Sequence, residues 1–330
     1  MDLRMKRSER RKKKRKGLRN FLIVTTLILV AGIVYWVAQY NSGLSMANEG
    51  SLKDDDASFE EFEGADPQFG EINVLLLGSD SRGKEDARAD TLMIAHYNQT
   101  THQMKLVSIM RDTYVDIPDH GYHKINTAFS LGGPELVRQT IKQNFEIDIH
   151  SYAIVDFTGF SKIVDVIAPD GIEVDIPYAM SHGIGMTLQP GNQVLNGEQL
   201  LGYVRFRHDK HNDYGRVERQ QEALSKLKDE AVSVHSLLNL PKLLGVVEPY
   251  VNTNVDNRTI LTIGKGLLIG KSGKIETLRI PVENSFDEVR EAAGEVLSID
   301  FEKNKQALQQ FLQTEDEVVN AELDEEVPKN

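Results

Sequence analysis

The side chains best suited to binding or catalysis lie in one short stretch, where two carboxylates stand among three guanidinium groups. They are Asp80, Arg82, Arg88, Asp90 and Arg111. Mg²⁺ binds one or two carboxylates together with substrate phosphate oxygens, and arginine holds phosphate through paired hydrogen bonds. These residue types therefore suit a divalent metal bound together with a polyanion. The alternative is that both aspartates are turn and strand-start residues paired with surface arginines, because aspartate is common in loops for local reasons.

Three apolar runs must position these five residues. Residues 72–77, 91–97 and 104–110 each read as a short strand, and polar segments separate them. If the second strand is antiparallel to both neighbours, the end of the first, the start of the second and the end of the third share one edge of a sheet. The five residues then converge at that edge, where ligand sites are common.

A second basic group lies about a hundred residues further along the chain. It consists of Arg205, Arg207, Arg216, Arg219 and Gln220. The last three are spaced i, i+3 and i+4, on one face of the first turns of an expected helix. Arginine there opposes the helix dipole, whereas a bound anion would face the free amide groups and the arginines together. The alternative is a solvated face with ion pairs to Glu218 or Glu222.

The N-terminus predicts a membrane anchor. The first twenty residues hold eleven lysines and arginines, and residues 21–39 carry no charge. That run suffices to cross a hydrocarbon core of about 30 Å and is too long for an ordinary signal peptide. We expect an uncleaved transmembrane helix at 21–40, with residues 1–20 in the cytoplasm and the remainder outside the cell. A nucleic-acid-binding arm is the other interpretation of the basic block.

The rest of the composition excludes several classes of protein. Without the basic block the chain is strongly acidic, which disfavours general binding to nucleic acid. The absence of cysteine excludes disulfides, cysteine-ligated zinc and a thiol nucleophile. His208 and His211 lack the further ligands that a zinc site needs, so we interpret them as polar loop residues. No P-loop and no Gly-x-Ser-x-Gly elbow is present.

The alternation of strand and helix patterns predicts an α/β domain, with a mixed central sheet and helices on both faces. We expect one domain at residues 71–313, an acidic linker at 41–70 and a disordered acidic tail at 314–330. Further strands are predicted at 152–155, 172–176 and 276–280, and helices at 134–144, 157–167, from 196, 216–234, 237–247 and 259–268.

Taken in order, the motifs resemble the LytR-CpsA-Psr family. They are LLGSDSR (76–82), RADT (88–91), SIMRD (108–112), HKIN (123–126), LNGEQ (195–199), and RFR (205–207) through GR (215–216) to RQQ (219–221). The resemblance implies a membrane-anchored phosphotransferase that attaches a glycopolymer, such as wall teichoic acid or capsule, to peptidoglycan. The implied donor is a polyprenyl-diphosphate-linked polymer, and the products are a phosphodiester and polyprenyl phosphate.

The resemblance also implies roles for individual residues. Asp80 and Asp90 correspond to acids associated with Mg²⁺, or Mn²⁺ in its place, and the implied catalytic set adds Arg88 and Arg111. The expected diphosphate-binding set is Arg82, Arg88, Arg111, Lys124, Arg205, Arg207, Arg216, Arg219 and Gln220. The family domain encloses a long apolar channel for the lipid tail. Residues 208–214 lie where family members vary in length, so the orientation of Asp209 and Asp213 stays open.

These arginines and aspartates fit phosphoryl transfer, because that reaction needs the charge on the leaving phosphate neutralised more than it needs a covalent nucleophile. The sequence leaves the general base open between Asp80 and Asp90. Two alternatives remain: a hydrolase of lipid diphosphates that uses water instead of a sugar hydroxyl, and a non-enzymatic envelope-binding or regulatory protein, since the family has been associated with transcription attenuation. The identity of the polymer is also left open.

Overall fold

The computed structural model describes the residues 24–27, 30–45, 60–67, 70–79, 89–208, 212–231, 242, 245, 250–269 and 275–313. Several predictions lie outside this set. They concern the site residues Asp80, Arg82 and Arg88, the loop residues 209–211, nearly all of the helix expected at 237–247, the basic segment 1–20 and the acidic tail 314–330.

The central sheet has six strands in the order β10-β3-β2-β1-β6-β9. They are β1 (Glu71–Ser79), β2 (Ala89–Asn98), β3 (Met104–Ile109), β6 (Ser151–Asp156), β9 (Val251–Thr253) and β10 (Glu276–Ile280). Strand β2 is antiparallel to both β1 and β3, whereas β6 runs parallel to β1. Gly78 therefore faces Thr91, and Leu92 faces Ile109. The end of β1, the start of β2 and the end of β3 share one edge, as the sequence required.

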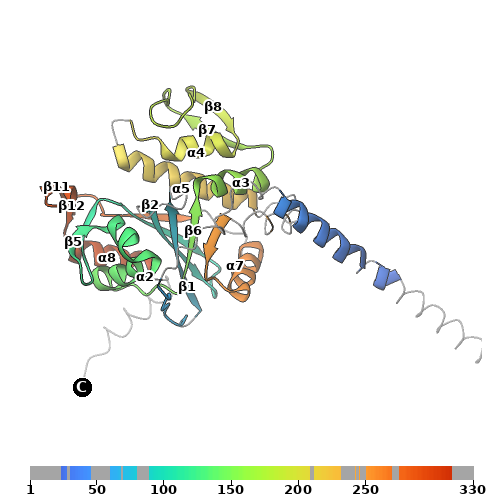
Figure 1. Cartoon of the computed structure of the whole chain (residues 1–330), viewed down its shortest axis with the longest axis horizontal. Helices are drawn as coiled ribbons and strands as arrows, with labels where there is room; N and C mark the ends of the chain where they lie inside the picture. The colour runs from blue at the N-terminus through green and yellow to red at the C-terminus, as the bar shows by residue number, and fades with distance from the viewer. Residues whose placement is uncertain are drawn as a thin grey trace, which may run out of the picture.

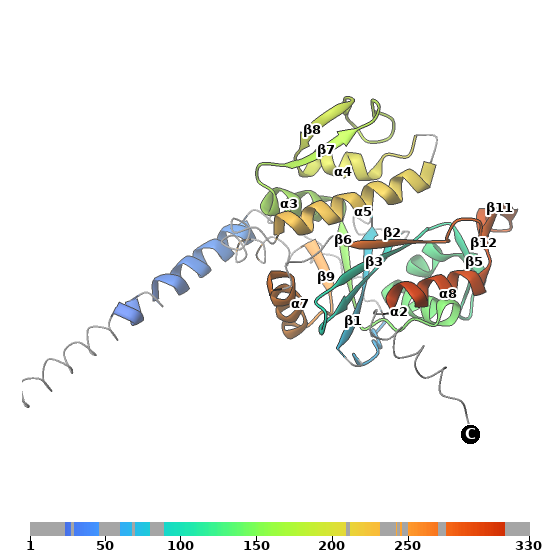
Figure 2. The ribbon, with the colours of Figure 1, turned by 180° about the vertical axis from the view of Figure 1, so that it is seen from behind.

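Helices cover both sides of this sheet (Figures 1 and 2). On one side lie α2 (Ile125–Phe145) and α8 (Phe301–Leu312), and on the other lie α3 (Phe157–Ile167), α4 (Gly197–Arg205) and α5 (Asn212–Ala231). Successive residues of a strand point to opposite sides, so each strand contributes to both layers. The predicted α/β architecture, a mixed sheet with helices on both faces, is confirmed.

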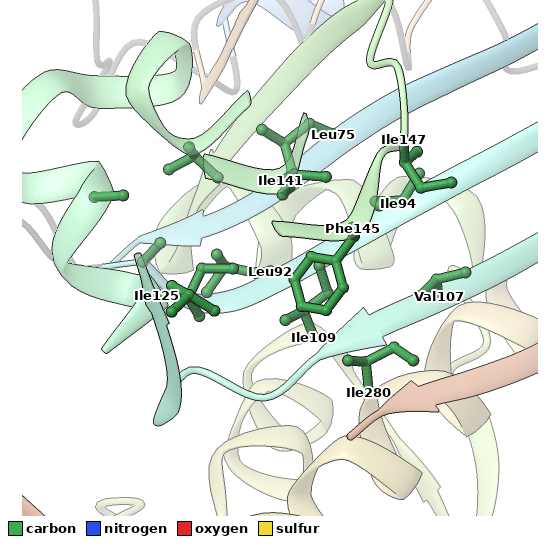
Figure 3. Packing of buried hydrophobic residues seen from close by; sticks show 14 of the residues in the cluster. Leu75, Leu92, Ile94, Val107, Ile109, Ile125, Ile141, Phe145, Ile147 and Ile280 are labelled. Carbon is green, nitrogen blue, oxygen red and sulfur yellow. The ribbon is translucent and has the colours of Figure 1, made fainter. Parts of the chain in front are cut away.

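The side that faces α2 and α8 is a solid apolar core. Figure 3 shows Ile141 and Phe145 of α2 beside strand residues that include Leu75 and Ile94. All four side chains are fully buried. Burying a leucine, isoleucine or phenylalanine side chain contributes roughly 1.5–3 kcal/mol to folding, so this layer fixes the sheet that carries the site.

Helix α2 begins earlier than the sequence predicted. Its backbone leaves helical geometry at Gly132 and Gly133, where Gly133 has a φ of 63°, and the second half starts at Pro134. Proline fits the first turn of a helix because its missing N–H has no partner there in any case. In the sequence, Pro134 indicated a helix start only for the second half of α2, so the prediction missed the first half.

Two smaller sheets flank the central one, and most of their strands were not predicted. One has the order β11-β12-β4-β5, and the other pairs β7 with β8. Their bounds are β4 (Thr113–Ile117), β5 (Gly121–Lys124), β7 (Ile172–Ile176), β8 (Gly191–Leu195), β11 (Phe286–Glu291) and β12 (Gly294–Ile299). Helix α7 (Asn257–Ile269) matches the helix expected at 259–268.

At the N-terminal end, one helix long and apolar enough to cross a membrane occupies Val24–Ser45, with a mean hydropathy of 1.4. It projects away from the sheet and its helices (Figure 1). The described end of the expected linker lies against the domain. There, the Glu63 N–H donates to Glu135 Oε2 (3.0 Å) and the Ala65 N–H to the Ile149 carbonyl (3.0 Å), while Phe62 packs on the core.

Candidate active site

The shared sheet edge brings the first two described site residues together. Asp90 lies at the start of β2, and Arg111 follows the end of β3. Because these strands are antiparallel neighbours, Arg111 Nη1 donates to Asp90 Oδ1 over 2.7 Å. The convergence that the sequence predicted is therefore present for this pair.

The second basic group reaches the same place from α4 and α5. Arg207, which follows α4, donates through Nη2 to Asp90 Oδ1 over 3.1 Å. Asp213, in the first turn of α5, accepts from Arg111 Nε (3.1 Å) and lies 3.4 Å from Arg216 Nη2. The orientation of Asp213, which the sequence left open, is inward. Two carboxylates and three arginines thus form one network.

Burial and charge act against each other in this network. Burial raises the pKa of Asp90, but the hydrogen bond from Arg111 and the charge of Arg207 outweigh it, so the pKa lies below the usual value. Burial also lowers the pKa of Arg216 to about 10, although Asp213 opposes this shift. Arg216 is only 3% exposed, and its Nε and Nη1 atoms have no hydrogen-bond partner among the described residues. Buried donors without partners are costly, and an anion would satisfy them.

A polar cavity of about 410 Å³ opens beside the network. It is lined by Asp90, Thr91, Phe157, His182, Gly183, Arg205, Arg207, His208, Arg216 and Gln220. The Arg205 guanidinium lies 4.1 Å from the centre of the Phe157 ring, and Gln220 Nε2 donates to Thr91 Oγ1 over 3.0 Å. Three arginines therefore converge on a space suited to a group with several negative oxygens.

An apolar cavity of about 450 Å³ continues from the polar one. It lies between the sheet and helices α3, α4 and α5, and is lined by side chains that include Leu76, Met93, Met104, Phe160 and Leu224. The two cavities share Thr91, Phe157, Arg205 and Gln220. A molecule with an anionic head and a hydrocarbon tail matches both spaces at once.

Three described residues of the predicted diphosphate-binding set do not line the polar cavity: Arg111, Lys124 and Arg219. Arg111 contacts the cavity wall through Asp90. Lys124 Nζ pairs with Asp112 Oδ1 (2.7 Å), and Asp112 Oδ2 accepts from Arg111 Nε (3.3 Å), so Lys124 stands one contact behind the network. Arg219 is buried, donates to the Phe206 carbonyl and lies over the Phe206 ring. The structure places Arg219 where it ties α5 to the end of α4.

Sequence reasoning missed several residues of the cavity wall. Phe157, His182 and Gly183 line it from segments that carried no predicted role. His208 was interpreted only as a loop residue, and Asp213 was left undecided. Asp213 lies three residues before Arg216, just ahead of the helix predicted at 216–234, and this position is the one signal that favoured it. His182 had no such signal.

The donor set suits a Mg²⁺ ion only together with a bound polyanion. No group of three or more histidine, aspartate or glutamate side chains stands ready to hold a metal in the described part of the chain. Asp90 contributes one carboxylate, and both of its ion pairs fall on Oδ1. Because Mg²⁺ accepts one or two carboxylates completed by phosphate oxygens, these residues fit such an ion.

Comparison with known proteins decides the family. The family described as LytR_cpsA_psr matches residues 33–313, most of the chain. The chain belongs to the LytR_cpsA_psr family. The resemblance drawn from the sequence motifs is thereby confirmed.

Relatives within the LytR_cpsA_psr family carry two kinds of name. Regulatory protein MsrR of Staphylococcus aureus (strain COL) is 41% identical over 281 residues, 85% of each chain. Polyisoprenyl-teichoic acid--peptidoglycan teichoic acid transferase TagU of Oceanobacillus iheyensis is 32% identical over 270 residues, 78% of this chain and 83% of its own.

Solved structures of TagT and TagV share the fold. The structure described as TagT bound to LIIa-WTA has a TM-score of 0.60 and 26% identity, and the match covers 80% of this chain and 96% of that one. TagV of B. subtilis has a TM-score of 0.62 and 27% identity, with 74% and 98% covered.

Proposed function

We propose that this protein transfers a glycopolymer from a polyprenyl diphosphate carrier to a hydroxyl group of peptidoglycan, forming a phosphodiester and releasing polyprenyl phosphate. One observation carries the proposal: a cavity with three arginines opens into an apolar cavity, and both share Arg205 and Gln220. A diphosphate with a long hydrocarbon chain has the matching chemistry. The name of TagU and the ligand in the TagT structure support the same substrate class.

The arginines have distinct parts in this reaction. Arg216 is held by Asp213, and its remaining buried donors suit a phosphate oxygen. Arg205 stands where the two cavities meet, beside the expected junction of diphosphate and lipid. Positioned guanidinium groups stabilise the charge that develops on the leaving phosphate. Arg82 and Arg88, outside the described residues, remain proposed members of the same set.

A divalent metal is part of the proposal. Asp90, with Asp80 as the second acid, would hold Mg²⁺ or Mn²⁺ together with the donor phosphates. When bound, the ion would supply further positive charge to the diphosphate. Arg111 and Arg207 orient the Asp90 carboxylate through Oδ1.

We place the reaction at the outer face of the cell membrane. The helix Val24–Ser45 and the basic segment before it support a single-pass anchor with a cytoplasmic N-terminus. A lipid-linked donor and peptidoglycan would both be within reach of a domain held there.

A purely regulatory or binding role is the second candidate, because the relative with 41% identity is named a regulatory protein. Such a protein would use the arginines to hold a lipid diphosphate without turning it over. A lipid-diphosphate hydrolase is the enzymatic alternative. The three functions differ in the fate of the donor.

The test combines the detergent-solubilised full chain with Mg²⁺, a polyprenyl-diphosphate-linked sugar and peptidoglycan fragments, and identifies products by mass. We expect the phosphodiester-linked product, and its loss in excess chelator. Arg205→Lys keeps the charge but loses the bidentate contact that arginine makes with phosphate. We therefore expect kcat/KM to fall about 100-fold, the rate loss that follows removal of one electrostatic donor.

The control for that variant is Arg290→Lys on the exposed strand β11, which should leave the rate unchanged. Hydrolysed donor as the only product, with acceptor in excess, would favour the hydrolase. Donor that binds and is never consumed would favour the regulatory role.

A further inference from the structure

Two histidines in the wall of the polar cavity have no part in the network of arginines and carboxylates. His182 lies in the segment between β7 and β8, and His208 follows Arg207 directly. Their rings stack, with centroids 4.5 Å apart and planes 23° apart. Within the described residues, no hydrogen bond engages a ring nitrogen of either histidine. Both rings thus border the polar cavity, and no described residue holds their nitrogens.

The backbone around His182 is fixed, although the side chain is exposed. Met180 and Leu188 exchange two backbone hydrogen bonds of 2.9 Å across the segment. Both side chains, and that of Ile184, are buried in the core beneath. The backbone position of His182 thus follows from the packing of its neighbours on both sides, and the stack on His208 places its ring.

The wall of the polar cavity is open next to His182, at Gly183. Gly183 lines the cavity, has a φ of 76°, and a side-chain atom added there would meet nothing within 4 Å. Neither histidine nor Gly183 lines the apolar cavity. An acceptor that enters here would reach the polar cavity at a part of its wall that the apolar cavity does not share.

Asp90 is the one carboxylate among the described residues that line the polar cavity, and it is poorly placed to take a proton. Asp90 Oδ1 accepts from two guanidinium groups, those of Arg111 and Arg207. Guanidinium contacts favour the charged form of a carboxylate and so oppose proton uptake. An imidazole with a free nitrogen is the usual proton acceptor near neutral pH.

We propose that His182 is the general base that accepts the proton of the acceptor hydroxyl, and that His208 is a positioning residue that holds the His182 ring by stacking. The inference rests on the transferase function proposed above. The acceptor oxygen forms a bond to the phosphorus that carries the glycopolymer, and the bridging P–O bond breaks. Its electron pair leaves on polyprenyl phosphate, the hydroxyl proton moves to a ring nitrogen of His182, and it passes from there to solvent.

The test replaces each ring by phenylalanine, which keeps a stacking face and removes the nitrogens. In the full-chain transfer assay, His182→Phe should lower kcat at least about 100-fold, the usual contribution of a general base, with donor binding unchanged. His208→Phe should lower kcat by less than about tenfold, because the stack is kept. His120→Phe, at the exposed turn between β4 and β5, is the matched control and should have no effect.

A chemical rescue separates a proton acceptor from a structural residue. Added imidazole should restore a measurable part of transfer in His182→Ala and none in Arg205→Lys. The assignment is wrong if His182→Phe transfers at the wild-type rate, which would leave the ring a stacking surface only, or if His208→Phe loses as much activity as His182→Phe. A wild-type chain that forms no phosphodiester product would instead contradict the transferase function itself, and the base assignment with it.

Discussion

The two faces of the central sheet are built from the same strands but differ in packing, since one is filled with side chains and the other is hollow. Leu75 faces a filled core beneath α2 and α8, and Leu76, the next residue, faces the open apolar cavity beneath α3 to α5. The filled face fixes the sheet, whereas the hollow face leaves apolar surface without a protein partner. Natural interiors are close-packed, so a cavity of this size beside a charged pocket indicates a ligand.

The largest expected difference between the faces is in stability. Leu75→Ala should lower the free energy of unfolding by about 2–5 kcal/mol, because it opens a void in a packed core. Leu76→Ala should lower the free energy of unfolding by about half of the Leu75→Ala loss or less, because the Leu76 side chain already borders open space. Urea unfolding of the detergent-solubilised chain measures both. Equal losses would show that the two faces are packed alike.

Filling the cavity should act on the donor and spare the fold. Ala153 lines the apolar cavity. Ala153→Leu should therefore lower the binding affinity for a long-chain polyprenyl diphosphate about tenfold and leave the affinity for a donor with a very short chain unchanged. The matched variant is Ala128→Leu in the filled core, where an overpacked side chain costs about 1–3 kcal/mol of stability. Titration of both donors, with a melting curve for each variant, measures the contrast. A loss of affinity for both donors by Ala153→Leu would argue against a tail in this cavity.

The smallest expected effect concerns the charged edge. The pKa of Asp90 is lowered in the folded state, mainly by Arg111 and Arg207 acting against burial. Its ion pairs therefore stabilise the fold above the ordinary aspartate pKa of about 3.9, and this contribution is lost as the pH falls below it. Wild type should exceed Asp90→Asn in unfolding free energy by less than about 1 kcal/mol at pH 7. The gap should shrink at pH 3, and a gap that widened there would contradict the ion pairing.

The sequence predicted those features that short-range patterns encode. Three apolar runs with polar breaks were enough for β1, β2 and β3, and so for the meeting of Asp90 and Arg111 at one edge. Strand β11 was missed because charged residues occupy all four of its exposed positions and leave little apolar pattern. Helix α8 carried a readable signal, an N-terminal Asp300 cap before Leu308 and Leu312 at helical spacing, that the prediction passed over.

The cavities were beyond sequence reasoning for a different reason. The wall of the apolar cavity is assembled from four strands, three helices and further residues, and each piece looks like ordinary core in its own segment. Phe62, assigned to a polar linker, packs on the core because its neighbours Glu63 and Ala65 bond to distant parts of the domain. Such contacts depend on tertiary structure, which local patterns do not contain.

The most direct test of the account asks where the two ends of a donor lie. A polyprenyl diphosphate with a photoreactive group in its tail would be crosslinked to the full chain, and the labelled residues identified by mass spectrometry. We expect labels on Met93, Met104 and Leu224, which line the apolar cavity, with labelling reduced by unlabelled polyprenyl diphosphate and by Arg205→Lys. Labels confined to the N-terminal helix or the outer surface, unaffected by competitor, would contradict the placement of the lipid on the hollow face.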